Sequence, residues 1–171
     1  MSWQCMRYAL ILPLLFSLLL IACSNEKNQA RKFNDSLIIH QVRLMDQLNQ
    51  INATILSGKR DSLQHQIDAA HAEVRKSIPE IKAIEVFPGG EKMKEKMVEL
   101  FEFYDELFSN DYQEYIQLMQ SDTAEESQLK RVLMQIQFRE LQAVQLEREL
   151  EDAQDSFTAS LGIRIVKDTA E

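Results

Sequence analysis

The sequence contains few of the glycines and prolines that form turns and few of the cysteines that form disulfides. Its 171 residues include two cysteines, four glycines, three prolines and one tryptophan. So few cysteines cannot build a disulfide framework, and so few glycines and prolines leave only a handful of breaks between long regular elements. A chain of this length with 45% hydrophobic residues can bury one substantial core. We therefore expect a single domain that packing alone stabilises.

Positive charge is also scarce. The 19 lysines and arginines are outnumbered by 27 aspartates and glutamates, which gives a formal net charge of −8. No basic cluster interleaved with aromatic residues occurs, and an acidic surface repels phosphate backbones. The composition therefore excludes nucleic acid as a partner.

The usual catalytic motifs are missing as well. The chain has no glycine-rich phosphate loop, no Gly-x-Ser-x-Gly elbow and no His-Glu-x-x-His pair. Helical bundles can hold two metal ions between Glu-x-x-His pairs, but only Asp68 and His71 approximate such a pair, and they occur once. We therefore predict a protein that is not an enzyme and that holds no cofactor and no metal.

The N-terminus carries the most specific pattern. Arg7 and the free amine precede an apolar run at residues 8–20, which is too short for a comfortable transmembrane helix and is typical of a signal peptide. The run ends in Leu-Ile-Ala-Cys at residues 20–23, which resembles the lipobox of bacterial lipoproteins. The resemblance implies cleavage before Cys23 and attachment of diacylglycerol to its thiol.

Lipidation would leave the mature chain without a free cysteine, because Cys5 departs with residues 1–22. Two or three acyl chains, each methylene contributing roughly 0.8 kcal/mol when buried, anchor a protein durably. Ser24 follows the cysteine where an aspartate would favour the inner membrane in well-studied Gram-negative lipoproteins. We therefore expect a cell-envelope protein that its lipid anchors to a membrane, the outer membrane of a Gram-negative bacterium.

After a polar tether at residues 23–29, the chain has the apolar periodicity of helices almost throughout. Spacings of three, four and seven define four apolar stripes. Their members are Phe33, Leu37, Leu44, Leu48, Ile51 and Ile55; Leu63, Ile67, Ala70, Val74, Ile78 and Ile81; Met93, Met97, Leu100, Phe101, Tyr104, Leu107, Phe108, Tyr115 and Leu118; and Leu129, Leu133, Ile136, Ala143, Val144, Leu150, Phe157 and Leu161.

The breaks between these stripes are short. Gly58, the Phe-Pro-Gly-Gly segment at residues 87–90 and a capping pair formed by Asp122 and Glu125 separate the helices, and Gly162 ends the last one. Short connections favour antiparallel neighbours. The predicted fold is therefore all-α, an antiparallel up-down four-helix bundle over residues 30–171, with the turns near Gly58 and Ser121 at the end far from the lipid.

Three segments of this predicted bundle resemble an uncharacterised family of bacterial surface lipoproteins with a single helical domain. They are Phe-Asn-Asp-Ser at residues 33–36, Pro88 in the central turn, and Leu-Phe-Glu-Phe-Tyr at residues 100–104. The resemblance implies an envelope location and a helical fold, and it implies no catalytic residues.

A polar layer is predicted about midway along the bundle. Counting from the two far turns places His40, Tyr104 and Glu140 at one level, with Arg75 close to it. A sheltered carboxylate needs a partner, which any of the other three could supply. The layer could form a ligand or metal site, but we favour a structural role in fixing helix register.

Four Asp-Ser or Asp-Thr pairs followed by an apolar residue resemble acceptor sites of bacterial O-glycosylation. The acceptors would be Ser36, Ser62, Thr123 and Thr169. Aspartate and serine also suit helix N-termini, where their side chains bond free backbone amides. Both interpretations stay open.

Two classes of function follow. The favoured one is a non-catalytic envelope component, tethered to the membrane through lipid on Cys23, that contacts another envelope or surface protein through its tip or an exposed helix face. The alternative is a bundle that binds a small molecule or metal, with possible enzymatic activity.

Overall fold

A computed structural model describes residues 3–57 and 62–163 of the protein, with side chains placed for residues 25–57 and 62–163. These ranges contain helices and no strand. The elements are α1 (Trp3–Ser57), α2 (Leu63–Ala83), α3 (Glu91–Leu107), the π-helical turn η2 (Phe108–Tyr112), α4 (Gln113–Gln120) and α5 (Glu126–Ser160). Because α3, η2 and α4 follow one another without a break, they form one rod. The predicted all-α helical bundle is confirmed.

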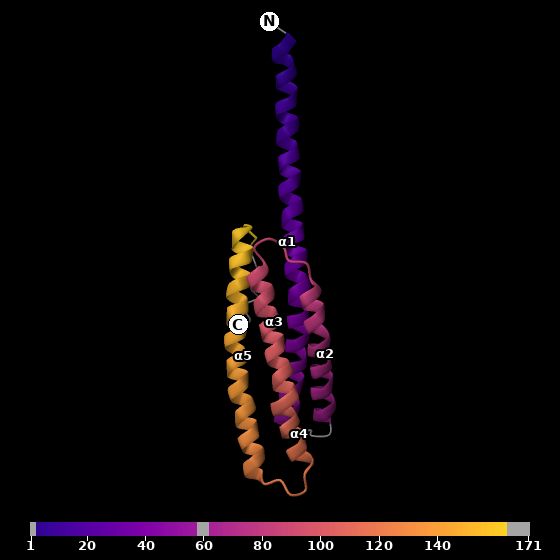
Figure 1. Cartoon of the computed structure of the whole chain (residues 1–171), viewed down its shortest axis with the longest axis vertical. Helices are drawn as coiled ribbons and strands as arrows, with labels where there is room; N and C mark the ends of the chain where they lie inside the picture. Colours follow the sequence, from indigo (N-terminus) through magenta and orange to yellow (C-terminus); the bar gives the residue numbers. More distant parts are fainter. Residues whose placement is uncertain (1–2, 58–61, 164–171) are drawn as a thin grey trace.

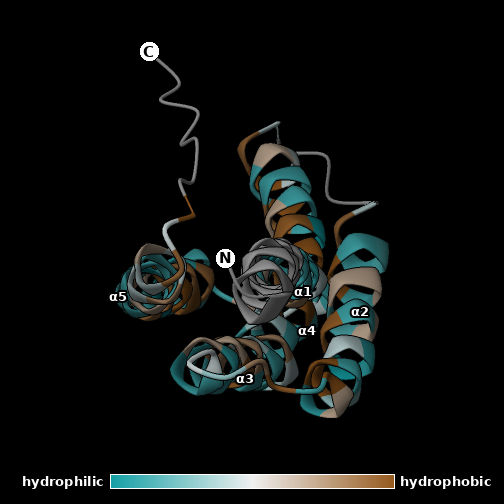
Figure 2. Cartoon of the chain, turned by 90° about the horizontal axis from the view of Figure 1, so that it is seen from above, coloured by the Kyte–Doolittle hydropathy of each residue, from teal (hydrophilic) through white to brown (hydrophobic). Residues whose placement is uncertain are grey.

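The rods run alternately up and down (Figure 1). The α2–α3 connection and the end of α5 lie where α1 leaves the bundle, and the α4–α5 connection lies at the opposite end. Viewed end-on, α5, α3 and α2 lie around α1 in that order (Figure 2). We call the end where α1 leaves the bundle the base and the opposite end the tip.

Helix α1 is much longer than its partners and projects beyond the base (Figure 1). Its backbone is helical through residues 23–29, where the sequence predicts a tether. That segment contains no glycine or proline to interrupt a helix. Among the described residues, no helix combines the length and the apolar character that a membrane span requires.

The buried side chains form one continuous core along the bundle. It contains most members of the four predicted stripes, because helical spacing of three and four turns them to one side. The largest fully buried members are Leu37, Leu44, Ile51, Leu63, Ile67, Ile81, Met93, Met97, Leu100, Phe101, Phe108 and Tyr112.

The third rod departs from the predicted stripe after Phe108. The wide turn η2 inserts one extra residue into the helix, which rotates the following face by about 100°. Tyr112 and Ile116 are therefore buried, whereas Tyr115 and Leu118, which the sequence placed on the stripe, are half-buried.

Two predicted helix ends had different outcomes. Gly162 does end α5, with a φ of 62° and with the N–H of Ile163 bonded to the carbonyl of Thr158 at 2.9 Å. The capping pair that opens α5 is Glu125 with Gln128, so the prediction of Asp122 with Glu125 was wrong. The backbone N–H of Glu125 donates to Gln128 Oε1 at 2.9 Å.

The base is closed by aromatic packing. The Phe33 ring of α1 lies edge-on to the Phe157 ring of α5, with centroids 5.4 Å apart, and Phe157 contacts Phe87 of the α2–α3 connection at 5.9 Å. Gly90, the residue before α3, lies against Phe33 so closely that a Cβ atom there would come within 2.3 Å of the ring. Helices α1 and α5 and the α2–α3 connection thus meet at one aromatic cluster.

Candidate functional site: polar pairs in the bundle and the outer face of α5

His40 is buried, as the predicted polar layer required, but its partner lies on α2. Its Nδ1 atom lies 3.0 Å from Ser77 Oγ, and its ring packs edge-on against Phe101. Burial lowers the pKa of the imidazole, because the charged form loses hydration; nearby Glu80 opposes that shift. His40 is therefore a core residue that contributes a polar contact between α1 and α2.

Glu140 of α5 is hydrogen-bonded to a residue of η2. Its carboxylate accepts a hydrogen bond from the Tyr112 hydroxyl at 2.9 Å, and Glu147 accepts one from Tyr104 at 3.2 Å. Burial raises the pKa of both tyrosines, and the neighbouring carboxylates raise it further. Burial also raises the pKa of Glu147, and the Tyr104 hydrogen bond opposes that shift.

The single layer predicted from His40, Arg75, Tyr104 and Glu140 is therefore corrected to separate pairs. Glu140 bonds Tyr112 instead of any of the three expected partners, and Arg75 is exposed on α2. Counting from the far turn failed because η2 inserts an extra residue and because a loop precedes α5. Glu147, which pairs with Tyr104, lies about two turns beyond Glu140.

Arg139 is also turned inward. Its guanidinium lies 4.5 Å above the Phe103 ring, and its Nε lies 3.8 Å from the buried carboxylate of Asp111. Gln135 donates to the other oxygen of Asp111 at 2.7 Å. The arginine thus covers Phe103, an aromatic residue that lies off the predicted stripe, and balances a buried acid in η2.

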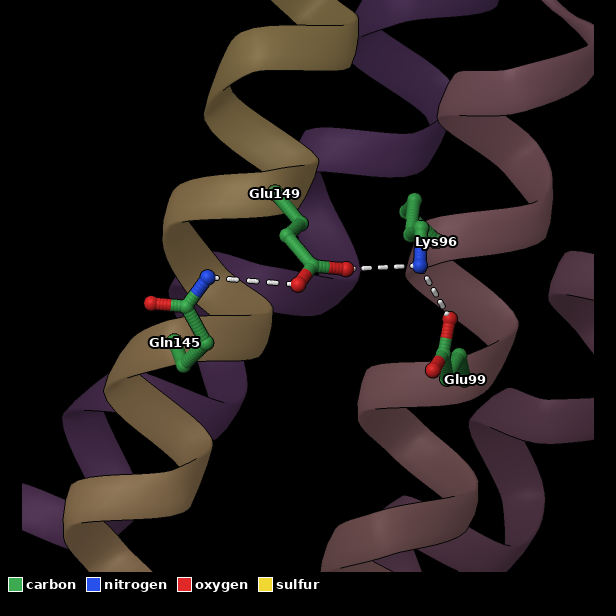
Figure 3. Close-up of polar contacts among 4 residues, drawn as sticks. All are labelled: Lys96, Glu99, Gln145 and Glu149. Atoms are coloured by element: carbon green, nitrogen blue, oxygen red, sulfur yellow. Dashed lines mark hydrogen bonds and ion pairs between the residues drawn. The ribbon is translucent and has the colours of Figure 1, made fainter.

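Nearer the base, a lysine links α3 to α5 (Figure 3). Lys96 Nζ lies 2.7 Å from carboxylate oxygens of both Glu149 and Glu99, and Gln145 donates to Glu149 at 3.2 Å. Hydrogen bonding to the two carboxylates raises the pKa of Lys96, and the same contacts lower the pKa of Glu149. The Glu99 and Glu149 side chains are partly exposed, so water weakens their ion pairs with Lys96. We regard the network as a contact that fixes the register between α3 and α5.

His71 does not pair with Asp68, its predicted neighbour in a metal motif. Its Nε2 lies 2.9 Å from Asp105 and 3.2 Å from Ser109, whereas Asp68 accepts from Gln64. Serine and aspartate share one ring nitrogen here, so the histidine cannot relay a proton from one to the other as in a catalytic triad. Across the described side chains, no three histidine, cysteine or acidic groups converge on a possible metal site.

The predicted modification sites differ in accessibility. Ser36 is half-buried, and its hydroxyl donates to the Phe33 carbonyl at 2.7 Å. Ser62, which directly precedes α2, and Thr123, which lies in the α4–α5 connection, are both exposed. Thr169 and the side chain of Cys23 lie outside the described residues.

The outward side of α5 carries a feature that the sequence analysis missed. Met134, Phe138 and Leu141 are 69%, 62% and 70% exposed, on the side opposite to the buried residues of the helix. Val144, predicted to be in the core, is also exposed, because it lies to one side of the buried stripe. The signal was a second apolar stripe with spacings of four and three.

The charges of this part of α5 are all turned away from its outward side. Every exposed residue between positions 132 and 147 is uncharged, although charged residues make up 27% of the chain. Arg139, Glu140 and Glu147, the charged residues within that span, are engaged by α3 and η2. We call this surface the α5 outer face, and its members are Met134, Gln135, Gln137, Phe138, Leu141, Gln142, Val144 and Gln145.

No protein-family model, curated protein or solved structure matches this chain. The resemblance to surface lipoproteins therefore stays a prediction that rests on the lipobox and on the three segments of the bundle.

Proposed function

We propose that this chain is a lipid-anchored protein of the bacterial cell envelope, a member of the surface-lipoprotein family that it resembles, whose helical bundle binds another protein without catalysing a reaction. The anchor would be lipid on Cys23, and the location the outer membrane of a Gram-negative bacterium. The α5 outer face is the observation that carries the proposal of protein binding.

Three large apolar side chains in a row, each more than three-fifths exposed, are costly to leave in water. Contiguous exposed apolar surface on soluble domains marks interaction sites, and the centres of protein interfaces are depleted of charge and enriched in methionine and aromatic residues. The α5 outer face has each of these properties. It also lies on the longest helix that is confined to the bundle, which offers a rigid platform.

The location of this face along α5 suits a tethered protein. Phe138 lies in the half of α5 nearer the tip, and α1 projects from the opposite end of the bundle (Figure 1). If residue 23 is held at a membrane, the face points sideways at a distance from the bilayer. A protein that lies alongside the bundle could then reach it.

Photocrosslinking in intact cells tests the proposal. Phe138 is replaced by a photoreactive phenylalanine analogue, and Gln117, an exposed polar residue of α4, receives the same analogue as a control. We expect a discrete crosslinked protein from position 138 and none from position 117. The crosslink should disappear when Met134→Gln and Leu141→Gln are introduced together.

If position 138 gives no crosslink, or if both positions give the same products, the α5 outer face is not a binding site. The proposed function would then lose its support.

A further inference from the structure

The stretch of α1 at the base differs in charge from the bundle that follows it. Between positions 24 and 34 there are three cations and one acid, a net charge of +2: Lys27, Arg31, Lys32 and Glu26. Residues 35–163 contain 13 lysines and arginines against 24 aspartates and glutamates, a net charge of −11. Positive charge is therefore concentrated at the end of the bundle from which α1 projects (Figure 1). We call Lys27, Arg31 and Lys32 the basal cations.

The basal cations have no partner of opposite charge within the bundle. All three are exposed, and none of them forms an ion pair with another described residue. Glu26 and Glu85 line one groove with Lys32, but neither carboxylate is bonded to it. Lys82 of α2, in contrast, is ion-paired with Glu102 at 2.6 Å. The charges of the basal cations are therefore available to an anion outside the protein.

The helical backbone of α1 fixes the distance of these charges from residue 23. At a rise of 1.5 Å per residue, Lys27 lies about 6 Å along the helix axis from residue 23, and Arg31 lies about 12 Å from it. The Cα–Cβ bonds of a helix tilt toward its N-terminus, so these long side chains lean toward residue 23. Attraction to an anionic membrane surface extends over about one Debye length, roughly 8–10 Å in physiological salt. A surface at residue 23 would therefore attract the basal cations.

We propose that Lys27, Arg31 and Lys32 bind the anionic phosphate headgroups of the bilayer that holds the lipid on Cys23. The same surface repels the acidic bundle at residues 35–163. Attraction at the base and repulsion of the rest together hold the bundle upright, with the α5 outer face clear of the bilayer. This inference rests on the lipid anchor of the proposed function and adds the residues that orient the anchored domain.

Energy transfer to labelled phospholipids tests the inference. The full lipidated chain, with acylation of Cys23 confirmed by mass, is placed in nanodiscs that contain phosphatidylcholine and phosphatidylglycerol. Asn28→Cys, at an exposed position, carries the donor dye, and the acceptor dye is attached to an acyl chain of one lipid or the other, so that each headgroup stays native. We expect at least about twofold more transfer to phosphatidylglycerol than to phosphatidylcholine in low salt, and no difference in high salt.

Charge reversal separates a local contact from the overall charge of the chain. Replacing the three basal cations together by glutamate should reverse the preference between the two lipids. The matched control combines Arg75→Glu, Lys76→Glu and Lys130→Glu, which change the net charge by the same amount at exposed positions of α2 and α5. This control should keep the preference for phosphatidylglycerol. All variants should keep the helical circular dichroism of the native chain, because every substituted side chain is exposed.

Three results would overturn the inference. Equal transfer to both lipids in low salt would show that the base does not bind anionic headgroups, and a preference that survives the charge reversal would show that other residues bind them. Either result leaves the lipid anchor and the protein-binding α5 outer face standing. If the native chain carries no lipid on Cys23, the anchor of the proposed function is wrong and this inference falls with it.

Discussion

Replacing Gly90 by alanine tests how the base of the bundle is packed. A Cβ atom at residue 90 would lie 2.3, 2.8 and 3.1 Å from three atoms of the Phe33 ring, closer than van der Waals contact allows. The φ angle of Gly90 is −94°, so alanine at this position does not have to adopt the left-handed backbone that disfavours it. The effect of the substitution should therefore be a steric one, passed to Phe33.

Phe33 is confined toward α5, and it can shift only toward the open groove that it lines with Ser36 and Phe87. It is 5% exposed, and Phe157 packs against it at 5.4 Å with Phe87 behind. Overpacking of this kind lowers the free energy of unfolding by about 1–3 kcal/mol. Alanine also reduces the entropy of the unfolded chain, which offsets about 0.4–1 kcal/mol of that loss. We expect Gly90→Ala to destabilise the protein by about 1–2 kcal/mol, which lowers Tm by roughly 2–4 °C per kcal/mol for a domain of this size.

Urea unfolding followed by circular dichroism measures this change, and a double-mutant cycle identifies its cause. Phe33→Leu makes room for the new methyl group, so Gly90→Ala in that background should cost far less than in the native chain. Gly89→Ala is the matched control: nothing lies within 4 Å of its Cβ position, but its φ of +87° penalises alanine whatever residue 33 is. If Gly90→Ala is as stable as the native protein, or if its effect adds to that of Phe33→Leu, the described contact is wrong.

Three further predictions concern the anchor and the polar pairs. Cys23→Ser should abolish acylation, detected by mass spectrometry and membrane fractionation, while residues 24–171 keep their helical circular dichroism; an unfolded domain would mean that the lipid completes the fold. Because burial lowers the pKa of His40, the unfolded chain takes up a proton that the folded chain resists, so stability should fall as pH decreases from 7 to 5. His40→Leu should flatten this slope, and an unchanged slope would assign it to other groups. Tyr112→Phe should cost about 1 kcal/mol in urea unfolding by leaving Glu140 without its partner, and it should cost nothing in a Glu140→Leu background if the hydrogen bond is the cause.

The helices and their up-down order could be predicted from the sequence because the signals are local and agree. Apolar spacing marks the buried sides, and the glycines stand at helix ends, as Gly162 does with its positive φ. Such signals depend on residues that are three or four positions apart. A helix places these residues on one side of itself, independently of the tertiary structure. The length of α1 was less predictable, because residues 23–29 contain polar residues that neither break nor demand a helix.

The polar pairs could not be predicted because they depend on register between rods. A register count assumes regular helices and turns of fixed length. The π-helical turn η2 breaks the first assumption, and the loop before Glu126 breaks the second. Helix α5 begins only at Glu126, beyond the turn at Ser121 from which the levels were counted, and η2 changes the face that follows it, so Tyr112 pairs with Glu140 and Tyr104 with Glu147.

These inward pairs also account for the composition of the α5 outer face. A helix with charged residues at 139, 140 and 147 would normally expose them, since long charged side chains extend into water. Here Phe103, Tyr112 and Tyr104 hold all three against the third rod. The π-helical turn takes part in this, because it buries Tyr112 and Asp111 on the side that faces α5. The irregular turn and the uncharged outer face are thus linked: because the charged side chains of 139, 140 and 147 are held against the third rod, methionine, phenylalanine, leucine and glutamine remain as the outer surface of this part of α5.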